Sequence, residues 1–277
     1  MTYTPRSKDQ LAARVAQDIF DGACVNLGIG MPTLVANHIP QEREVLLHSE
    51  NGILGMGPAP LAGHEDYDLI NAGKQPVTLL AGGAYFHHAD SFAMMRGGHL
   101  DICVLGAFQV SATGDLANWS TGEPGAIPAV GGAMDLAIGA KQTWVMMDLL
   151  TKQGASKVVA QCSYPLTGIG CVKRIYTDLC TLACTPTGLQ LIDTVSGLSL
   201  AELCLRAREA AAGAPLAICL LSGVPEAELP VLESRITQRV SYPGTAAAGL
   251  TVMESEPDGD AAAEIYALAN EIKHKLI

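Results

Sequence analysis

Residues 24–38 of the 277-residue chain read CVNLGIGMPTLVANH, and this stretch decides the fold class. A short apolar run ends in Gly28-Ile29-Gly30, and Pro32 follows at a position where the first turn of a helix accepts proline. The order strand, glycine turn, helix is the unit from which parallel sheets are built. The stretch therefore predicts an α/β fold in which ligands collect where strands end in such turns.

Similar short apolar runs continue along the chain, and several are separated by segments of helix length. They span residues 45–47, 77–80, 101–107, 143–147, 179–184 and 189–192. Runs of this kind are typical of strands that are buried on both faces. Ahead of them, Ser7 and Gln10 form a capping-box pattern that predicts a first helix. Together these patterns predict an open, largely parallel sheet flanked by helices.

Composition narrows the class of protein. Hydrophobic residues make up 49% of the chain and charged residues only 16%, so we expect a sizeable core and an apolar surface covered by a partner subunit. The net charge of −11 and the lack of a Lys/Arg cluster argue against a nucleic-acid ligand. The N-terminus is polar, and no apolar run is long enough to span a bilayer. We therefore expect a cytoplasmic protein with no membrane contact.

The chain changes character after Gly213-Ala214-Pro215, where proline-containing and acidic stretches begin. We predict one domain over residues 1–215 and a C-terminal extension over residues 216–277. The extension ends in a predicted amphipathic helix, whose apolar face carries Ile265, Leu268, Ile272 and Leu276.

Glu50 is the first candidate for chemistry. It follows the apolar run at residues 45–47 and lies in the stretch LLHSENGILG, residues 46–55. Asn51-Gly52 favours a turn with positive φ that would fix the direction of the glutamate side chain. Because apolar residues flank it at a strand end, we expect a partly dehydrated carboxylate that is more nucleophilic or basic than usual.

Gly131-Gly132 before Ala133 forms the second candidate, because paired glycines let backbone N–H groups approach a developing oxyanion. The same residues also fit a plain turn that starts a helix. Gly82-Gly83 and Gly97-Gly98 are similar pairs, and the sequence does not rank the three. His87-His88 is expected in an extended segment, where adjacent side chains point to opposite sides, so no metal site is predicted there. Motifs of serine hydrolases, P-loop NTPases and dinucleotide dehydrogenases are missing from the sequence.

Ser49-Glu50-Asn51-Gly52 resembles the S-E-N-G signature of the B subunit of class I CoA-transferases. Further stretches similar to that family are NLGIGMP (26–32), RGGHLD (96–101), GDLANW (114–119), GGAMDL (131–136) and YPLTG (164–168). Together the matches cover roughly residues 8–215. The stretches DSFAM (90–94), VLGAFQVS (104–111) and IPAVGG (127–132) are most similar to the 3-oxoadipate (β-ketoadipate) branch.

The resemblance implies a ping-pong transfer of CoA from succinyl-CoA to a 3-oxo acid, through a glutamyl-CoA thioester on Glu50. It favours 3-oxoadipate as the acceptor, with acetoacetate next. It also implies a separate A subunit in a hetero-oligomer, and no metal or redox cofactor, since the CoA thioester is itself a substrate. The substrate-binding, CoA-binding and oxyanion residues that it implies are Asn51, Gly30, Gly131, Gly132 and Ala133.

Two other functions stay open at this stage. Glu50 could act as a base that activates water, which would make the protein an acyl-CoA hydrolase. Alternatively, the chain could be a non-catalytic scaffolding subunit that docks a partner through its terminal helix. One departure from the family bears on the acceptor acid, because Asp148-Leu149 stands where many relatives carry Glu-His.

Overall fold

The computed structural model describes residues 3–122, 125, 131–186, 188–199, 202–203 and 263. The chain divides into two compact units, residues 1–223 and 224–277. Apart from Ala263, the predicted extension over residues 216–277 and its terminal helix lie outside the described residues, so the boundary after residue 215 stays a prediction. No helix in the described part of the chain is long and apolar enough to cross a membrane.

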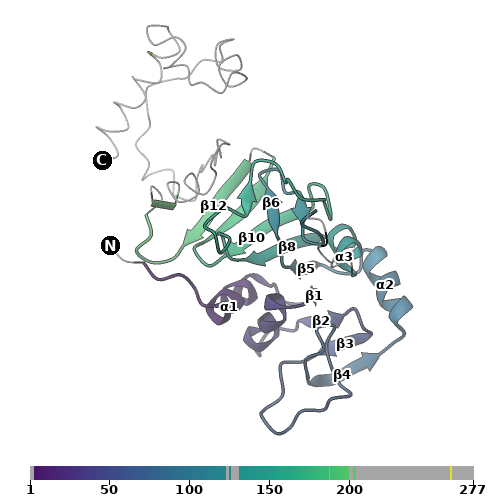
Figure 1. Ribbon diagram of the computed structural model, residues 1–277. Coiled ribbons are helices and arrows are strands. Elements are labelled where there is room, and N and C mark those ends of the chain that lie inside the picture. Colours follow the sequence, from purple (N-terminus) through teal and green to yellow (C-terminus); the bar gives the residue numbers. More distant parts are fainter. Residues whose placement is uncertain are drawn as a thin grey trace. The chain divides into compact units, whose positions relative to one another are not determined.

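The main sheet has a parallel centre and antiparallel edges. Its strands are β1 (Cys24–Leu27), β2 (Leu46–Ser49), β3 (Ile53–Met56), β4 (Leu79–Tyr85), β5 (Ile102–Leu105), β8 (Gln142–Met147), β10 (Val172–Thr177), β11 (Cys180–Thr185) and β12 (Gly188–Thr194). They lie in the order β12-β11-β10-β8-β5-β1-β2-β3-β4 (Figure 1). The neighbours from β10 to β2 pair in parallel, and antiparallel hairpins extend both edges.

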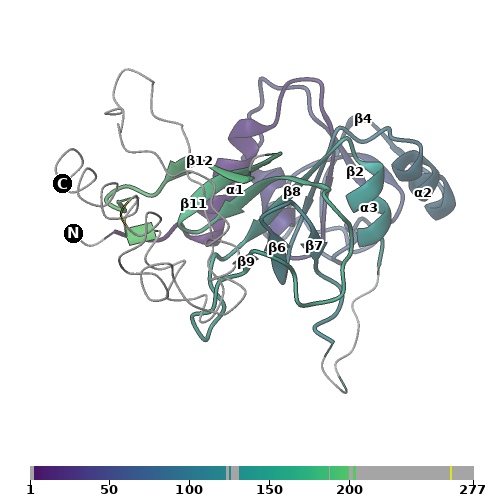
Figure 2. The same cartoon turned by 90° about the horizontal axis from the view of Figure 1, so that it is seen from above.

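Both faces of the parallel centre are covered. The helices are α1 (Lys8–Asp18), α2 (His88–Arg96) and α3 (Ala133–Gly139), with the 3-10 helix η1 (Met31–His38) after β1. A small sheet contains β6 (Gln109–Ser111), β7 (Leu116–Ala117) and β9 (Val158–Val159). In Figure 2, α1 lies on one side of the main sheet and the small sheet on the other.

Alternate residues of one strand supply the two cores. Ile102 and Val104 of β5 pack in the cluster that contains α1, whereas Cys103 and Leu105 pack in the cluster that contains α3 and the small sheet. All four are buried, which explains why the strand reads as a continuous apolar run. The predicted α/β fold with an open, largely parallel sheet is confirmed.

Local predictions are confirmed at α1, and the predicted helix with Pro32 in its first turn is present as η1, whereas the extended segment predicted at His88 is wrong. The capping box is formed, since Gln10 N donates to Ser7 Oγ at 3.2 Å and Ser7 N donates to Gln10 Oε1 at 2.8 Å. The helix after the glycine turn is a 3-10 helix, which starts with a three-residue bond from Thr33 N to the carbonyl of Gly30. His88 is helical rather than extended, because His87 caps α2 through a bond from Ala89 N to His87 Nδ1.

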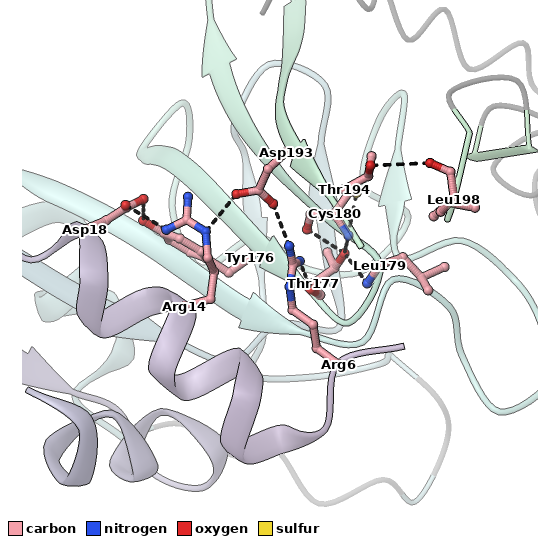
Figure 3. Close-up of polar contacts among 10 residues, drawn as sticks. All are labelled: Arg6, Arg14, Asp18, Tyr176, Thr177, Leu179, Cys180, Asp193, Thr194 and Leu198. Carbon is pink, nitrogen blue, oxygen red and sulfur yellow. Dashed lines mark hydrogen bonds and ion pairs between the residues drawn. The ribbon is translucent and has the colours of Figure 1, made fainter. Parts of the chain in front are cut away.

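A charged cluster ties α1 to the far edge of the sheet (Figure 3). Asp193 of β12 accepts hydrogen bonds from Arg6 at 2.6 Å and from Arg14 at 2.7 Å. At the other end of α1, Asp18 pairs with Arg174 of β10 and accepts a bond from the Tyr176 hydroxyl at 2.8 Å. These contacts hold the N-terminal segment against β10 and β12.

Candidate active site

The turn between β2 and β3 carries Glu50. Gly52 in this turn has a φ of 108°, as the Asn51-Gly52 pair predicts, and an added Cβ would overlap the carbonyl oxygen of Phe86. The Gly52 N–H donates to the carbonyl of Ser49 at 3.0 Å, and the Gly52 carbonyl accepts from Phe86 N at 3.0 Å. Both bonds fix the turn, so Glu50 is held directly at the carboxyl end of β2.

Asn51 and Ser49 connect this turn to a neighbouring loop. The Ser49 hydroxyl donates to Asn51 Oδ1 at 2.6 Å, and Asn51 Nδ2 donates to the carbonyl of Ile70 at 2.8 Å. Ala72 N donates to Ser49 Oγ at 3.3 Å. The structure thus uses the Asn51 side chain to hold the loop and does not bring it to the cavity described below, so its predicted contact with a substrate stays a prediction.

His48, two residues before Glu50, is buried and neutral. Asn26 Nδ2 lies 2.9 Å from His48 Nδ1 and must donate to it, which leaves Nε2–H to donate to Ser91 Oγ at 3.0 Å. Burial lowers the pKa of His48 to about 4. The ring also stacks on Phe86, with the ring centroids 5.8 Å apart. It therefore joins β2 to β1 and α2 beneath the turn.

A cavity of about 490 Å³ lies at the carboxyl ends of the parallel strands. Glu50 lines it, and so do Gly28, Gly106 and Asp148, which follow β1, β5 and β8. The position agrees with the rule that ligands bind where parallel strands end. Of the predicted site residues, Gly131, Gly132 and Ala133 join Glu50 in the lining.

Gly30 does not line this cavity, although its neighbours Ile29 and Met31 do. Its φ of 91° gives it a turning role at the start of η1, and an added Cβ would meet no atom within 4 Å. A contact from Gly30 to CoA stays a prediction.

Glu50 and Gly132 are in close contact. A Cβ added at Gly132 would overlap Glu50 Oε2 and would lie 3.1 Å from Phe92 Cζ. Gly132 also precedes α3, whose first bond runs from Leu136 N to the Gly132 carbonyl, so the earlier N–H groups have no partner within the helix. Free N–H groups beside a carboxylate suit a reaction in which negative charge develops on oxygen.

The electrostatics of Glu50 follow from this setting. Burial raises the pKa of its carboxyl group, and the nearby His88 lowers the pKa in part. A partly dehydrated carboxylate is a stronger nucleophile and base than one in water. The geometry therefore fits either attack on an acyl group or proton transfer.

Sequence reasoning missed that α2 brings side chains close to Glu50 and Gly132. The rings of His88 and Phe92 lie tilted at 51° to each other with centroids 4.9 Å apart, and the Arg96 guanidinium lies 5.5 Å from the Phe92 ring centroid. Arg96 also donates to Asp135 of α3 at 2.7 Å. The spacing of four residues between His88, Phe92 and Arg96 could have indicated one helix face, had the segment been assigned as helix.

Lys157 was also missed. It lies just before β9 and lines the cavity. Among the described residues that line this cavity, it is the single lysine or arginine. Within the described chain, no group of three or more His, Cys, Asp or Glu side chains is arranged to hold a metal ion.

The chain thus combines an α/β fold with a partly buried carboxylate at the carboxyl ends of its parallel strands. The family model for coenzyme A transferase matches residues 8–197, and the chain belongs to this family and is a CoA-transferase enzyme. It is 67% identical over 204 residues to the B subunit of 3-oxoadipate CoA-transferase from Pseudomonas putida, covering 73% of this chain and 95% of that protein.

More distant relatives agree with this assignment. The chain is 50% identical over 198 residues to the B subunit of a probable succinyl-CoA:3-ketoacid coenzyme A transferase from Bacillus subtilis, covering 71% of this chain and 91% of that one. An acyl-CoA transferase from Escherichia coli O157:H7 superimposes with a TM-score of 0.55 at 19% identity, over 73% of this chain and 40% of that chain. The structural likeness shows the shared fold.

Proposed function

We propose that the chain is the B subunit of an enzyme that transfers CoA from succinyl-CoA to 3-oxoadipate, with acetoacetate as the next candidate acceptor. The 67% identity to the Pseudomonas putida protein, over nearly its whole length, supports this acceptor. The name of the Bacillus subtilis relative supports succinyl-CoA as the donor. The contact between the Glu50 carboxylate and Gly132 in the cavity is the observation that carries the mechanism.

The first half-reaction converts Glu50 to a thioester. A Glu50 carboxylate oxygen attacks the thioester carbonyl of succinyl-CoA, the C–S bond breaks, and CoA leaves as the thiolate. The product is a mixed anhydride of succinate and Glu50. The thiolate then attacks the Glu50 carbonyl of this anhydride, a C–S bond forms, and succinate leaves with both of its carboxylates. The enzyme now carries a glutamyl-CoA thioester.

The second half-reaction reverses these steps with the acceptor. A carboxylate of the 3-oxo acid attacks the glutamyl thioester, releasing CoA thiolate and forming a second anhydride. The thiolate attacks the acceptor's carbonyl, which gives the new acyl-CoA and restores the Glu50 carboxylate. Protons balance without an external acid, and no metal or redox cofactor is required.

Each step passes through a tetrahedral oxyanion. The N–H groups of the turn at Gly131, Gly132 and Ala133, which have no hydrogen-bond partner among the described residues, would stabilise it, as the sequence predicts. The anhydride and the thioester must also be kept from water. Buried apolar residues of the cavity wall, among them Leu27 and Leu105, suit that demand.

A separate A-type subunit is part of the proposal, because the relatives are named as B subunits. We infer a hetero-oligomer in the cytoplasm. The low charged fraction of 16% fits a chain that shares part of its surface with a partner.

An acceptor assay with the chain co-purified with its A-type subunit tests the proposal. Acyl-CoA product and free CoA thiol would be followed in parallel, with succinyl-CoA and either 3-oxoadipate, acetoacetate or no acceptor. We expect acyl-CoA formation that needs the acceptor and disappears in E50A, whereas E42A, at an exposed glutamate, keeps it.

The competing functions give different results in the same assay. Release of free CoA without an acceptor would indicate the hydrolase that uses Glu50 as a base. Neither product in an assembled complex would indicate a non-catalytic scaffolding subunit.

A further inference from the structure

Lys157 is held rigidly at one wall of the cavity that contains Glu50. Its N–H donates to the carbonyl of Leu149 at 2.9 Å, and its carbonyl accepts from Val110 N at 2.9 Å. The first bond attaches Lys157 to the segment just after β8, and the second attaches it to β6. Its backbone is thus fixed from both sides, and the half-buried residue lines the same cavity as the candidate nucleophile.

Two carboxylates act on the charge of Lys157 without a hydrogen bond to its ammonium group. Burial lowers the pKa of the Lys157 ammonium, and the charges of Asp148 and Asp178 counteract that effect. Asp178 already accepts a hydrogen bond from Leu149 N at 2.8 Å, and Asp148 is exposed at the cavity. Within the described part of the chain, the Lys157 ammonium forms no hydrogen bond and no ion pair. Its three N–H donors are therefore free for a ligand.

The sheet sets the separation between Lys157 and Glu50. Glu50 follows β2, and Lys157 is bonded to the residue two positions after β8, with β1 and β5 between these strands. Neighbouring strands are about 4.8 Å apart, so the turn at Glu50 and the segment after β8 are separated by about 14 Å. The hydrogen bond from Lys157 N to the Leu149 carbonyl places the Lys157 backbone about one further spacing from that segment. Both residues line the same cavity of about 490 Å³. An acyl group bonded to Glu50 at one end would extend into this cavity, which Lys157 also lines.

We propose that Lys157 binds the distal carboxylate of a dicarboxylic acyl group and thereby makes the enzyme prefer dicarboxylic 3-oxo acids over monocarboxylic ones. The inference rests on the proposed function and refines its substrate class. An ammonium group with free donors is a suitable partner for a carboxylate, and charge-assisted bonds of this kind are the stronger ones. The donor succinyl-CoA carries such a carboxylate as well, so the same contact would serve both half-reactions.

The test compares two acceptors of equal chain length, 3-oxoadipate and 3-oxohexanoate, in wild type, K157Q and K152Q. Lys152 is exposed in the same loop and does not line the cavity, so K152Q is the matched control. In a ping-pong reaction, kcat/KM for the acceptor depends only on the second half-reaction. The comparison is therefore not affected by weaker use of succinyl-CoA in the variant.

We expect K157Q to lower kcat/KM for 3-oxoadipate by about 10- to 100-fold, the worth of one hydrogen bond to a charged group. The value for 3-oxohexanoate should change less than about threefold, and K152Q should match wild type for both acids. Equal losses for both acceptors, or no loss for 3-oxoadipate, would overturn the assignment of Lys157 while CoA transfer itself continues. Absence of transfer by wild type to either acid would instead overturn the proposed function and this inference with it.

Discussion

The Glu50 carboxylate lies directly against the backbone of Gly132, so closely that Oε2 is the first atom an added Cβ would meet. The contact joins the turn after β2 to the start of α3, two segments that are 82 residues apart in the sequence. It leaves the carboxylate beside free backbone N–H groups, and it requires glycine at position 132.

Gly132→Ala should therefore displace Glu50 and lower kcat/KM by about 100-fold, the typical cost of a misplacement of about 1 Å. The φ of −74° at this residue suits alanine, so the loss would come from the contact and not from backbone strain. Steady-state kinetics with succinyl-CoA would measure it. G131A is the comparison, because its Cβ would meet nothing within 4 Å, and it should cost far less. Equal losses in both variants would contradict this reading.

Gly52→Ala should damage the turn that carries Glu50. The φ of 108° already disfavours alanine, and the added Cβ would overlap the Phe86 carbonyl oxygen. We expect a loss of about 3 kcal/mol in the free energy of unfolding together with a loss of activity. G63A measures the cost of the positive φ alone, because Gly63 has a φ of 85° and open space around it. It should lower the free energy of unfolding by about 1 kcal/mol. Urea unfolding that shows the same loss for both would refute the role of the Phe86 contact.

His48 should make the protein less stable in acid. Its pKa is about 4 in the folded state and about 6.5 when unfolded, so between these values the unfolded chain binds more protons. Stability from this residue is complete above pH 6.5 and decreases as the pH falls towards 4. We expect a loss of about 2 kcal/mol between pH 7.5 and pH 5 that H48Q does not show. Urea unfolding at both pH values checks this, and an identical acid loss in H48Q would exclude His48 as its source.

Asp193→Asn should loosen the N-terminal segment without touching the candidate active site. The substitution leaves the partly buried Arg6 and Arg14 without their shared carboxylate (Figure 3). We expect the free energy of unfolding to fall by about 2 kcal/mol, with kcat unchanged. D9N removes an exposed pair with His38 and should cost about 0.5 kcal/mol. A reduced kcat in D193N would show that the cluster also serves the reaction.

The fold class and the position of Glu50 could be predicted from the sequence, because both depend on local patterns. Apolar runs located the parallel strands β1, β2, β5 and β8 but missed β10, where Lys173 and Arg174 interrupt the apolar pattern. The strand-end rule placed Glu50 at the cavity that also contains Gly131 to Ala133. Two of the predicted site residues do not line this cavity. The Asn51 side chain donates a hydrogen bond to the carbonyl of Ile70, and Gly30 turns the chain beside the cavity. No local sequence pattern indicates the direction of this side chain or of this turn.

The sequence did not predict the start of α2 or the position of Lys157, and both omissions have a physical reason. The cap of α2 is a histidine, whereas helix starts are usually read from Ser, Thr, Asp or Asn. Lys157 reaches the cavity only because its backbone bonds to Leu149 and Val110, which pairs segments that the sequence does not connect. Such long-range contacts set the direction of single side chains, and neither composition nor periodicity predicts these contacts.

We propose that Glu50 carries CoA as a thioester during turnover, and this thioester can be trapped. The chain and its A-type subunit would be incubated with succinyl-CoA and treated with borohydride, which reduces a thioester to an alcohol. Intact mass and peptide mapping should then show residue 50 with one oxygen fewer and two hydrogens more in wild type, and no change in E50A. Turnover of 3-oxoadipate without any modification at residue 50 would show that Glu50 does not carry CoA.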